Sequence, residues 1–282
     1  MTSVLVNGVN LNTLGYQVDV LSGRRIVPVR QDYGLSLPGM AGTTVSAGPM
    51  GETLLTLEMW VDDADPTTGA RSDGWTKFEA NLAQVASAFV RPNGLVSVTL
   101  TEMDGIQKVA TGVLTAYVVD EDKRRVRAVI KVPKVFLRGA AELTFTSTTF
   151  GSPVTNTQLQ TAKSNAPISD AVITVNGPAV NPVITDAIGG QSVNWLSGSL
   201  ASGEKWELDI GKRTSRKILS GGGASSVMPT TVYAPLELGA PIMELWPLLS
   251  NLTDPHQYRL TVTAASTTGA SSWSVKAKPA YL

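Results

Sequence analysis

The stretch LVSVTLTEMDGIQKVATGVLTAYVVDEDKRRVRAVIKV, which begins at Leu95 and ends at Val132, decides the class of fold. Apolar and polar residues alternate along it in three runs, Leu95–Thr101, Val109–Val119 and Val126–Val132. A period of two is that of a half-buried strand. The turn signal Asp104-Gly105 and the charged run Asp120–Arg125 separate the runs. The stretch therefore predicts three consecutive antiparallel strands.

The same alternation extends in both directions from this stretch. The other runs that predict strands are Val4–Val6, Tyr16–Leu21, Thr53–Val61, Ala171–Val175, Val180–Thr185, Ser192–Leu196, Trp206–Ile210, Arg216–Leu219, Tyr258–Thr263 and Ser272–Ala277. Glycines and prolines separate them at short intervals, which is typical of sandwiches and barrels rather than of alternating strands and helices. We expect an all-β protein with one helix.

That helix is predicted between Ser72 and Val90, where the period changes. The apolar residues are spaced by three and four positions, in the order Trp75, Phe78, Leu82, Val85 and Phe89. Ser72 or Asp73 is placed to cap the first turn, and Arg91-Pro92 ends the helix. Such a stripe usually packs on its own sheet, and the alternative is a contact between subunits.

A change in composition divides the chain. Ser, Thr, Asn, Gln and Pro dominate from Thr146 to Pro167, as in a linker or a long crossing loop. We expect an N-terminal β-sandwich or barrel with the helix in residues 1–148, a linker or crossing loop in 149–166, and a C-terminal jelly-roll β-sandwich in 167–282.

A glycine-rich stretch, Asp32–Gly51, interrupts the first domain. It is predicted to be a long loop, and long loops inside compact domains usually serve an interaction. Pro38, Gly39 and Met40 at its centre are therefore candidate contact residues.

The composition excludes several classes of function. The 282 residues include 23 basic and 23 acidic side chains, no cysteine and one histidine, His256. A net charge of zero does not fit a sequence-independent nucleic-acid binder, and the missing cysteines and histidines remove zinc fingers, thiol nucleophiles and multi-histidine metal centres. No window approaches the roughly 18 apolar residues of a membrane helix, and the N-terminus has no secretion signal. We expect a soluble protein with no membrane insertion, no cofactor and no metal.

Three short motifs suggest chemistry, and each has a simpler interpretation. Gly211–Thr214 is similar to the end of a phosphate-binding loop, but Arg213 stands where Ser or Thr is required. The acidic cluster at Asp62, Asp63 and Asp65 lacks the calcium-loop pattern and fits a solvated turn. His256 follows Asp254, but no G-x-S-x-G motif offers a nucleophile. We predict no catalytic residues.

Four tryptophans lie in the second half. Trp195, Trp206 and Trp273 each share a strand face with apolar neighbours and are predicted to be core. Trp246, beside Pro247, is ambiguous, and is the candidate for stacking against a sugar ring.

The order and spacing of several segments carry a resemblance to a known family. They are Val6–Leu11 (VNGVNL), Leu14–Tyr16, Arg24-Arg25, Leu37–Thr43 (LPGMAGT), Val172–Pro178 (VITVNGP), Asn181–Thr185 (NPVIT) and Lys278–Leu282 (KPAYL). Over nearly its whole length the chain resembles the distal tail proteins of siphoviruses, the long-tailed bacteriophages. The predicted helix near Trp75 lies where that family has one, while the Ser/Thr-rich segment from Thr146 to Pro167 and the glycine loop at Gly221 depart from some relatives.

The resemblance implies a function. It implies a homohexameric ring at the tip of the virion tail, closed by the first domain and decorated by a galectin-like second domain. The ring joins the tail tube protein to the tip hub protein of the baseplate, and is assembled in the cytoplasm of the host bacterium. A closed ring repeats one contact between unlike surfaces and needs no catalytic group.

Three other functions remain open at this point. A carbohydrate-binding tail module would contact the host envelope through Trp246. An envelope-degrading hydrolase would use Asp254 and His256 or an acid pair, and a major tube protein would also be β-rich and ring-forming.

Overall fold

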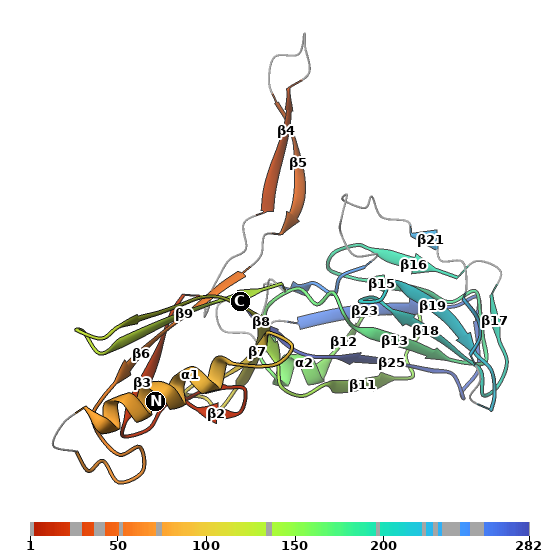
Figure 1. Cartoon of the computed structure of the whole chain (residues 1–282). Helices are drawn as coiled ribbons and strands as arrows, with labels where there is room; N and C mark the ends of the chain where they lie inside the picture. The colour runs from red at the N-terminus through yellow and green to blue at the C-terminus, as the bar shows by residue number, and fades with distance from the viewer. Residues whose placement is uncertain are drawn as a thin grey trace. The chain divides into compact units, whose positions relative to one another are not determined.

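The computed structural model describes residues 3–22, 30–36, 43–50, 53–71, 75–133, 137–195, 198–221, 224–227, 231–232, 243–248 and 257–281. The chain divides into two compact units (Figure 1). Unit 1 contains Met1–Gln31 and Met50–Ala140, and unit 2 contains Asp32–Pro49 and Ala141–Tyr281. The described part of the chain is mostly strand, which confirms the predicted all-β class.

Unit 1 is built on one large antiparallel sheet, here the first sheet. Its strands follow the order β2-β1-β7-β8-β9-β6-β3, and β10 pairs with β8. Their bounds are β1 Ser3–Val6, β2 Val9–Asn10, β3 Tyr16–Ser22, β6 Thr53–Val61, β7 Leu95–Thr101, β8 Gln107–Asp120, β9 Arg125–Val132 and β10 Leu137–Gly139. The predicted three-stranded meander is β7, β8 and β9. In the described residues β2 and β3 do not pair, so the first sheet is open rather than a barrel.

Helix α1, Thr76–Phe89, covers one face of the first sheet (Figure 1). Phe78, Val85 and Phe89 are buried, and the Phe89 ring lies 5.6 Å from that of Tyr117 on β8. The stripe therefore packs on its own sheet. Residues 72–74, which include the predicted caps Ser72 and Asp73, lie outside the described residues.

The stretch 32–51 differs from the prediction of a long loop. It contains β4, Arg30–Ser36, and β5, Thr43–Met50, which pair as a two-stranded sheet of their own. The glycines and Pro38 masked this strand signal, because both residue types are rare inside strands. Pro38, Gly39 and Met40 lie outside the described residues.

Unit 2 contains two larger sheets and a small one. The larger sheets have the orders β11-β25-β13-β18-β19-β20 and β12-β23-β15-β16-β21 with β22 on β23, and the small sheet is β17-β14-β24. The bounds are β11 Leu143–Ser147, β12 Val154–Thr155, β13 Val172–Asn176, β14 Ala179–Val180, β15 Val183–Asp186, β16 Ser192–Asn194, β17 Ser199–Leu200, β18 Lys205–Asp209, β19 Thr214–Ile218, β20 Ala224–Val227, β21 Thr231–Val232, β22 Pro247–Leu248, β23 Gln257–Thr263, β24 Ser266–Thr267, β25 Ser272–Ala277 and β26 Ala280–Tyr281. The two larger sheets form the layers of a sandwich.

Tryptophans fill the core between these layers. Trp195, Trp206 and Trp273 are all buried, as predicted. The Trp195 and Trp206 rings lie 5.8 Å apart. The indole N–H of Trp206 donates to Ser215 Oγ at 2.8 Å, and that of Trp273 donates to the Thr149 carbonyl at 2.7 Å. The strand alternation thus identified three large core residues whose polar atoms are also satisfied.

The segment 149–166, expected to be a linker or crossing loop, forms part of unit 2. It holds β12 and a second, short helix that was not predicted, α2, Thr157–Thr161. The Asn156 side chain caps α2 by accepting from Leu159 N at 3.1 Å. Buried Ser164 bonds the hydroxyl of Tyr258 at 2.8 Å and the Ala280 carbonyl at 3.0 Å. The polar side chains here make structural contacts, because Asn156 caps α2 and Ser164 hydrogen-bonds to Tyr258 and Ala280.

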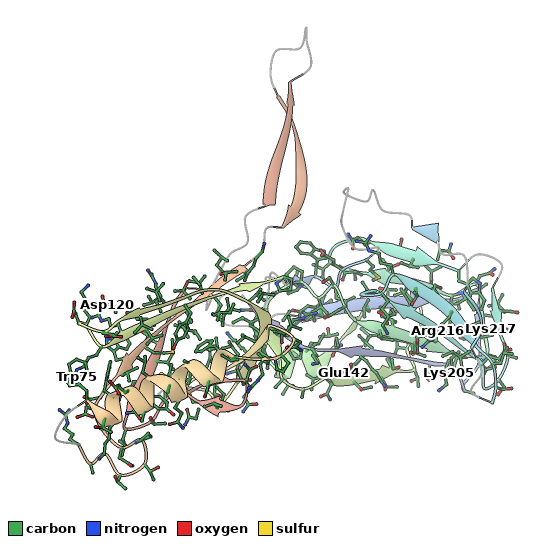
Figure 2. The ribbon with its side chains drawn as sticks, viewed as in Figure 1. Trp75, Asp120, Glu142, Lys205, Arg216 and Lys217 are labelled. Carbon is green, nitrogen blue, oxygen red and sulfur yellow. The ribbon has the colours of Figure 1, made fainter. Side chains whose placement is uncertain are left out.

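The outward face of the β11-β25-β13-β18-β19-β20 sheet is polar. On this face Arg216 Nε donates to Glu207 at 2.8 Å, whereas the next residue, Lys217, lies opposite Trp206 and its ammonium is 2.6 Å from Glu204. Figure 2 shows Lys205, Arg216 and Lys217 on neighbouring strands at one end of the sandwich. A surface ion pair contributes little stability, so the Arg216–Glu207 pair marks this face as solvent-exposed.

A buried carboxylate holds one turn of unit 2. Asp186 is 1% exposed, and its Oδ2 accepts from the backbone N–H of Gly189 at 2.6 Å and of Trp246 at 3.4 Å. It therefore joins the turn after β15 to the segment that leads into β22. Burial raises the pKa of the Asp186 carboxyl to about 6, although these N–H groups act in the opposite direction.

This pKa predicts a pH-dependent stability. Because the folded chain holds a proton on Asp186 between about pH 4 and 6 where the unfolded chain does not, the contribution of this group is complete below pH 4 and is lost as the pH rises through 6. We expect the free energy of unfolding of the wild type to fall by roughly 2–3 kcal/mol more between pH 4 and 7 than that of Asp186→Asn. Urea unfolding at both pH values measures it, with the exposed Glu142→Gln as control, and equal pH slopes for wild type and Asp186→Asn would contradict it.

Candidate interaction surface

The first sheet has one covered and one bare face. On the covered face Leu55, Leu57 and Met59 of β6 are fully buried. Their neighbours on the same strand point the other way, because side chains alternate along a strand, and Leu54 and Trp60 are 51% and 38% exposed. We call the face that carries Leu54 and Trp60 the bare face.

The register gathers exposed apolar side chains on the bare face. Leu95 pairs with Val113, Val113 with Lys131, and Lys131 with Leu54, so one row crosses four strands. Directly paired side chains are neighbours on the same face. Leu95, Val113 and Leu54 are all exposed, and Val118 is exposed further along β8. Leu95 and Val113 are therefore direct neighbours on the bare face, and the charged Lys131 lies between them and Leu54.

Charges of both signs lie on the bare face. Arg127 pairs with Val118 on one side and Glu58 on the other, and Glu58 pairs with Asp19. The Arg125 guanidinium lies 5.6 Å from the Trp60 ring and 3.9 Å from Glu58. The face thus offers apolar area together with balanced charge.

Unit 2 lacks a comparable surface in the described residues. Its exposed large apolar side chains there are Val180 and Leu219, and the others lie in unit 1. Contiguous exposed apolar area on a soluble protein marks an interaction site. The contrast selects the bare face as the candidate site of this molecule.

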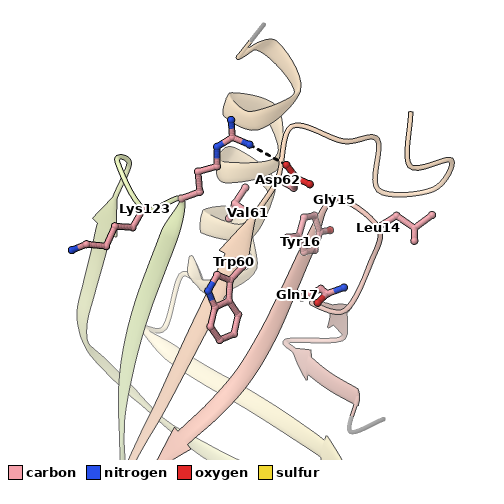
Figure 3. Close-up of a pocket in the computed structure, with 9 residues that line it drawn as sticks. Leu14, Gly15, Tyr16, Gln17, Trp60, Val61, Asp62 and Lys123 are labelled. Carbon is pink, nitrogen blue, oxygen red and sulfur yellow. Dashed lines mark hydrogen bonds and ion pairs between the residues drawn. The ribbon is translucent and has the colours of Figure 1, made fainter. Parts of the chain in front are cut away.

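A pocket of about 360 Å³ lies where the bare face ends (Figure 3). Three segments far apart in the sequence line it, namely Leu14–Gln17, Trp60–Asp62 and Lys123-Arg124. Its walls combine the ring of Trp60 and the exposed side chain of Leu14 with the side chains of two cations and one carboxylate, whereas the Tyr16 side chain is buried on the covered face beside Val61. Such a lining suits a ligand that is partly apolar and partly anionic.

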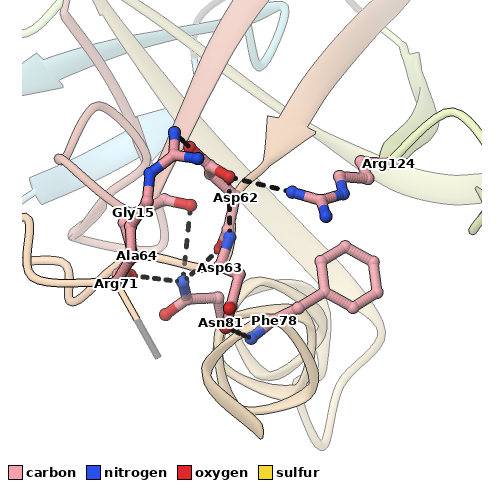
Figure 4. Close-up of polar contacts among 8 residues, drawn as sticks. All are labelled: Gly15, Asp62, Asp63, Ala64, Arg71, Phe78, Asn81 and Arg124. Carbon is pink, nitrogen blue, oxygen red and sulfur yellow. Dashed lines mark hydrogen bonds and ion pairs between the residues drawn. The ribbon is translucent and has the colours of Figure 1, made fainter. Parts of the chain in front are cut away.

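Arg124 shapes one side of this pocket. Its guanidinium lies 3.0 Å from Asp62 Oδ1, 5.4 Å from the Trp75 ring and 5.9 Å from the Phe78 ring. Arg71 holds the other oxygen of Asp62 at 2.8 Å (Figure 4). Arg124 therefore joins the β8–β9 turn to the start of α1.

Asn81 of α1 fixes the loops behind the pocket. This residue is 2% exposed, and its amide nitrogen donates to the carbonyls of Asp62 and Ala64 at 2.8 Å and approaches that of Gly15 at 3.4 Å (Figure 4). Gly15 leaves room for this contact, since a Cβ there would lie 2.6 Å from the Ala64 carbonyl oxygen. One side chain thus sets the distance between two pocket segments.

The three residues of the acidic cluster found in the sequence all accept hydrogen bonds in this region. Asp62 binds the two arginines, Asp63 Oδ1 accepts from Phe78 N at 3.1 Å, and Asp65 Oδ1 accepts from Thr67 N and Thr68 N. Asp63 is therefore the side-chain cap of α1, supplied from a distant loop. Among the described residues no group of three or more His, Cys, Asp or Glu is arranged to hold a metal.

The predicted contact residues are distributed as follows. Of the helix stripe, Phe78, Val85 and Phe89 are buried, Leu82 is partly buried, and Trp75 is 54% exposed beside the pocket arginine. Sequence reasoning missed the bare face and the pocket. The alternation of β6 contained the signal, because Leu54 and Trp60 are large apolar residues at positions where a solvated strand carries polar ones.

The remaining candidates lie in unit 2. Trp246 is half-buried, and its ring lies so close to Gly189 that a Cβ there would be 2.6 Å from the indole. A sugar contact at Trp246 stays a prediction. Lys212 pairs with Asp209 at 3.0 Å in the turn of the Gly211–Thr214 motif. Asp254 and His256 lie outside the described residues. Among those that are described, no helix has the length and apolar character to span a bilayer.

Comparison with known proteins identifies the fold. No family model and no curated protein matches the sequence. A solved structure does match, the crystal structure of the Dit protein of phage SPP1, described as a paradigm of the hub adsorption apparatus in phages that infect Gram-positive bacteria, with a TM-score of 0.56 at 13% identity over 100% of both chains.

The chain has the fold of a phage Dit protein. The likeness covers both units, so the family resemblance found in the sequence is confirmed for the fold. The baseplate of phage P2 in its activated conformation with Ca is also similar, over 100% of both chains, at a TM-score of 0.39 and 6% identity, which is too weak to support an argument.

The Asn81 contacts predict a large loss of stability from a nearly isosteric change. Asn81→Asp replaces a donor by an acceptor that faces two carbonyl oxygens at 2.8 Å, so we expect unfolding to become easier by on the order of 3 kcal/mol. Thermal unfolding measures it. The control is Gln84→Glu, the same amide-to-acid change at an exposed position of α1. Similar midpoints for the two variants would show that Asn81 does not hold the loops.

Proposed function

We propose that this chain is a structural component of a siphovirus tail tip, a distal tail protein. In this proposal six copies form a ring that connects the tail tube to the tip hub of the baseplate. The observation that carries it is the shared Dit fold over the full length of both chains. The proposal assigns the protein to the virion, assembled in the host cytoplasm, with no cofactor and no turnover.

The surface of unit 1 supports a ring. A closed ring repeats one contact between two unlike surfaces of the same chain. The bare face supplies apolar area with balanced charge, which suits a partner that is itself neutral, and the chain carries 23 basic and 23 acidic residues. In the same proposal unit 2, a galectin-like sandwich, decorates the rim with its polar outward face.

Native mass spectrometry of the purified chain tests the ring. We expect a species of six times the 29.7 kDa chain mass, and immunogold electron microscopy of virions should then place the protein at the tail tip. Gold along the tube, or none on virions, would contradict the location. A strictly monomeric chain across the micromolar range would contradict the ring.

A paired substitution tests the role of the bare face. Val113→Asp replaces an apolar side chain between Leu95 and Lys131 by a charged one. We expect it to weaken ring formation at least about tenfold, since the contact loses apolar area. Leu219→Asp is the matched control, because Leu219 is 42% exposed against 48% for Val113 and belongs to unit 2. Mass photometry over a dilution series measures both. Equal weakening by the two variants would exclude a specific role for the bare face.

A further inference from the structure

The most exposed large apolar side chain in the described residues has no role in the fold. Met103 is 84% exposed at the tip of the β7–β8 turn. An apolar side chain that projects from a turn gains nothing by staying in water. Met103 is therefore a candidate contact residue for a partner surface.

Hydrogen bonds fix the backbone of the turn that carries Met103. Glu102 N donates to the Ile106 carbonyl at 3.0 Å, and Gly105 N to the Glu102 carbonyl at 3.0 Å. Gly105 has φ +82, which glycine adopts without strain. At the base the Lys108 ammonium lies 2.8 Å from Glu102, with both side chains largely buried. A turn whose backbone is already ordered loses little backbone entropy when it binds.

The pocket at the end of the bare face has the complementary chemistry. The Trp60 ring supplies the aromatic surface that a thioether prefers, and Leu14 adds exposed apolar area. Its volume, about 360 Å³, lies within the range of small-molecule sites in proteins. A methionine side chain and part of its turn therefore fit.

Charge adds direction to this fit. Around the pocket, Lys123 pairs with Asp120 at 2.9 Å, and Arg124 and Arg71 share Asp62, so three cations face two carboxylates. Met103 is followed by exposed Asp104. Complementary charge around an apolar anchor fixes its orientation more than its affinity.

One copy cannot fill its own pocket. Thr101 and Gln107 pair where the β7–β8 turn leaves the first sheet. At the other end of β8, Asp120 pairs with Arg125, Arg125 with Trp60, and Trp60 with the pocket residue Gln17, so the pocket lies at that end. β8 spans 14 residues, so roughly 40 Å of strand separates turn from pocket. The two ends can meet only between copies.

We propose that the Met103 turn of one copy inserts into the pocket beside Trp60 and Leu14 of the next. The contact joins unlike surfaces, so it propagates head to tail until it closes into a ring. It rests on the proposed function, which it deepens by naming the residues of the contact between copies.

Cysteine crosslinking tests this contact cleanly, because the chain has no cysteine. In the double variant Met103→Cys, Gln17→Cys both positions are exposed, and a short bis-maleimide reagent cannot bridge them within one copy. We expect a ladder of covalent oligomers on a denaturing gel. A mixture of the two single variants should stop at the dimer, and Met103→Cys, Gln84→Cys, with its second cysteine on α1, should give no ladder.

The outcomes separate this contact from the ring itself. Oligomers by native mass spectrometry with no ladder, or with equal crosslinking of the Gln84→Cys control, overturn the contact and leave the ring standing. A chain with no oligomer at all overturns both. As a second readout, Met103→Asp should weaken self-association at least about tenfold while Met103→Leu retains it, and equal affinities for these two variants would also overturn the insertion.

Discussion

The pocket and the loops around it depend on one buried amide. Asn81 donates from α1 to backbone carbonyls of two separate loops, and a buried carbonyl that loses its donor costs about 1–3 kcal/mol. The loops therefore have one conformation in which Gly15, Asp62 and Ala64 all face the helix. That conformation also places the segments Leu14–Gln17 and Trp60–Asp62 in the pocket lining. A polar contact in the interior thus sets the shape of a surface outside.

Local patterns made much of the fold predictable. Thr53–Val61 and Leu95–Thr101 alternate in the sequence and are strands with the same bounds in the structure, because alternation depends only on which side of a sheet each residue faces. The same reasoning placed the tryptophan core of unit 2. The stripe from Phe78 to Phe89 predicted the body of α1 for an equivalent reason, since a period of 3.6 also needs no knowledge of the partner.

Features that depend on distant partners were not predictable in this way. The cap of α1 comes from Asp63, 15 positions before the amide that it accepts from, and the pocket combines three segments that only the register of the first sheet brings together. The polarity of 149–166 indicated a linker, but those side chains cap α2 and bind across the sandwich. Composition reports how polar a segment is, and it does not report which partner satisfies the polar groups.

Copies of a chain without net charge must orient one another through short-range contacts. With 23 charges of each sign, long-range attraction between copies is weak, so it neither steers nor orients their encounter. Specificity then rests on short-range fit, and such fit requires surfaces that are fixed before they meet. Unit 1 meets this condition at both ends of β8, with a turn held by its own hydrogen bonds and a pocket held by Asn81. The bare face between them supplies apolar area but little direction, so the ends of the sheet decide how one copy is set against another.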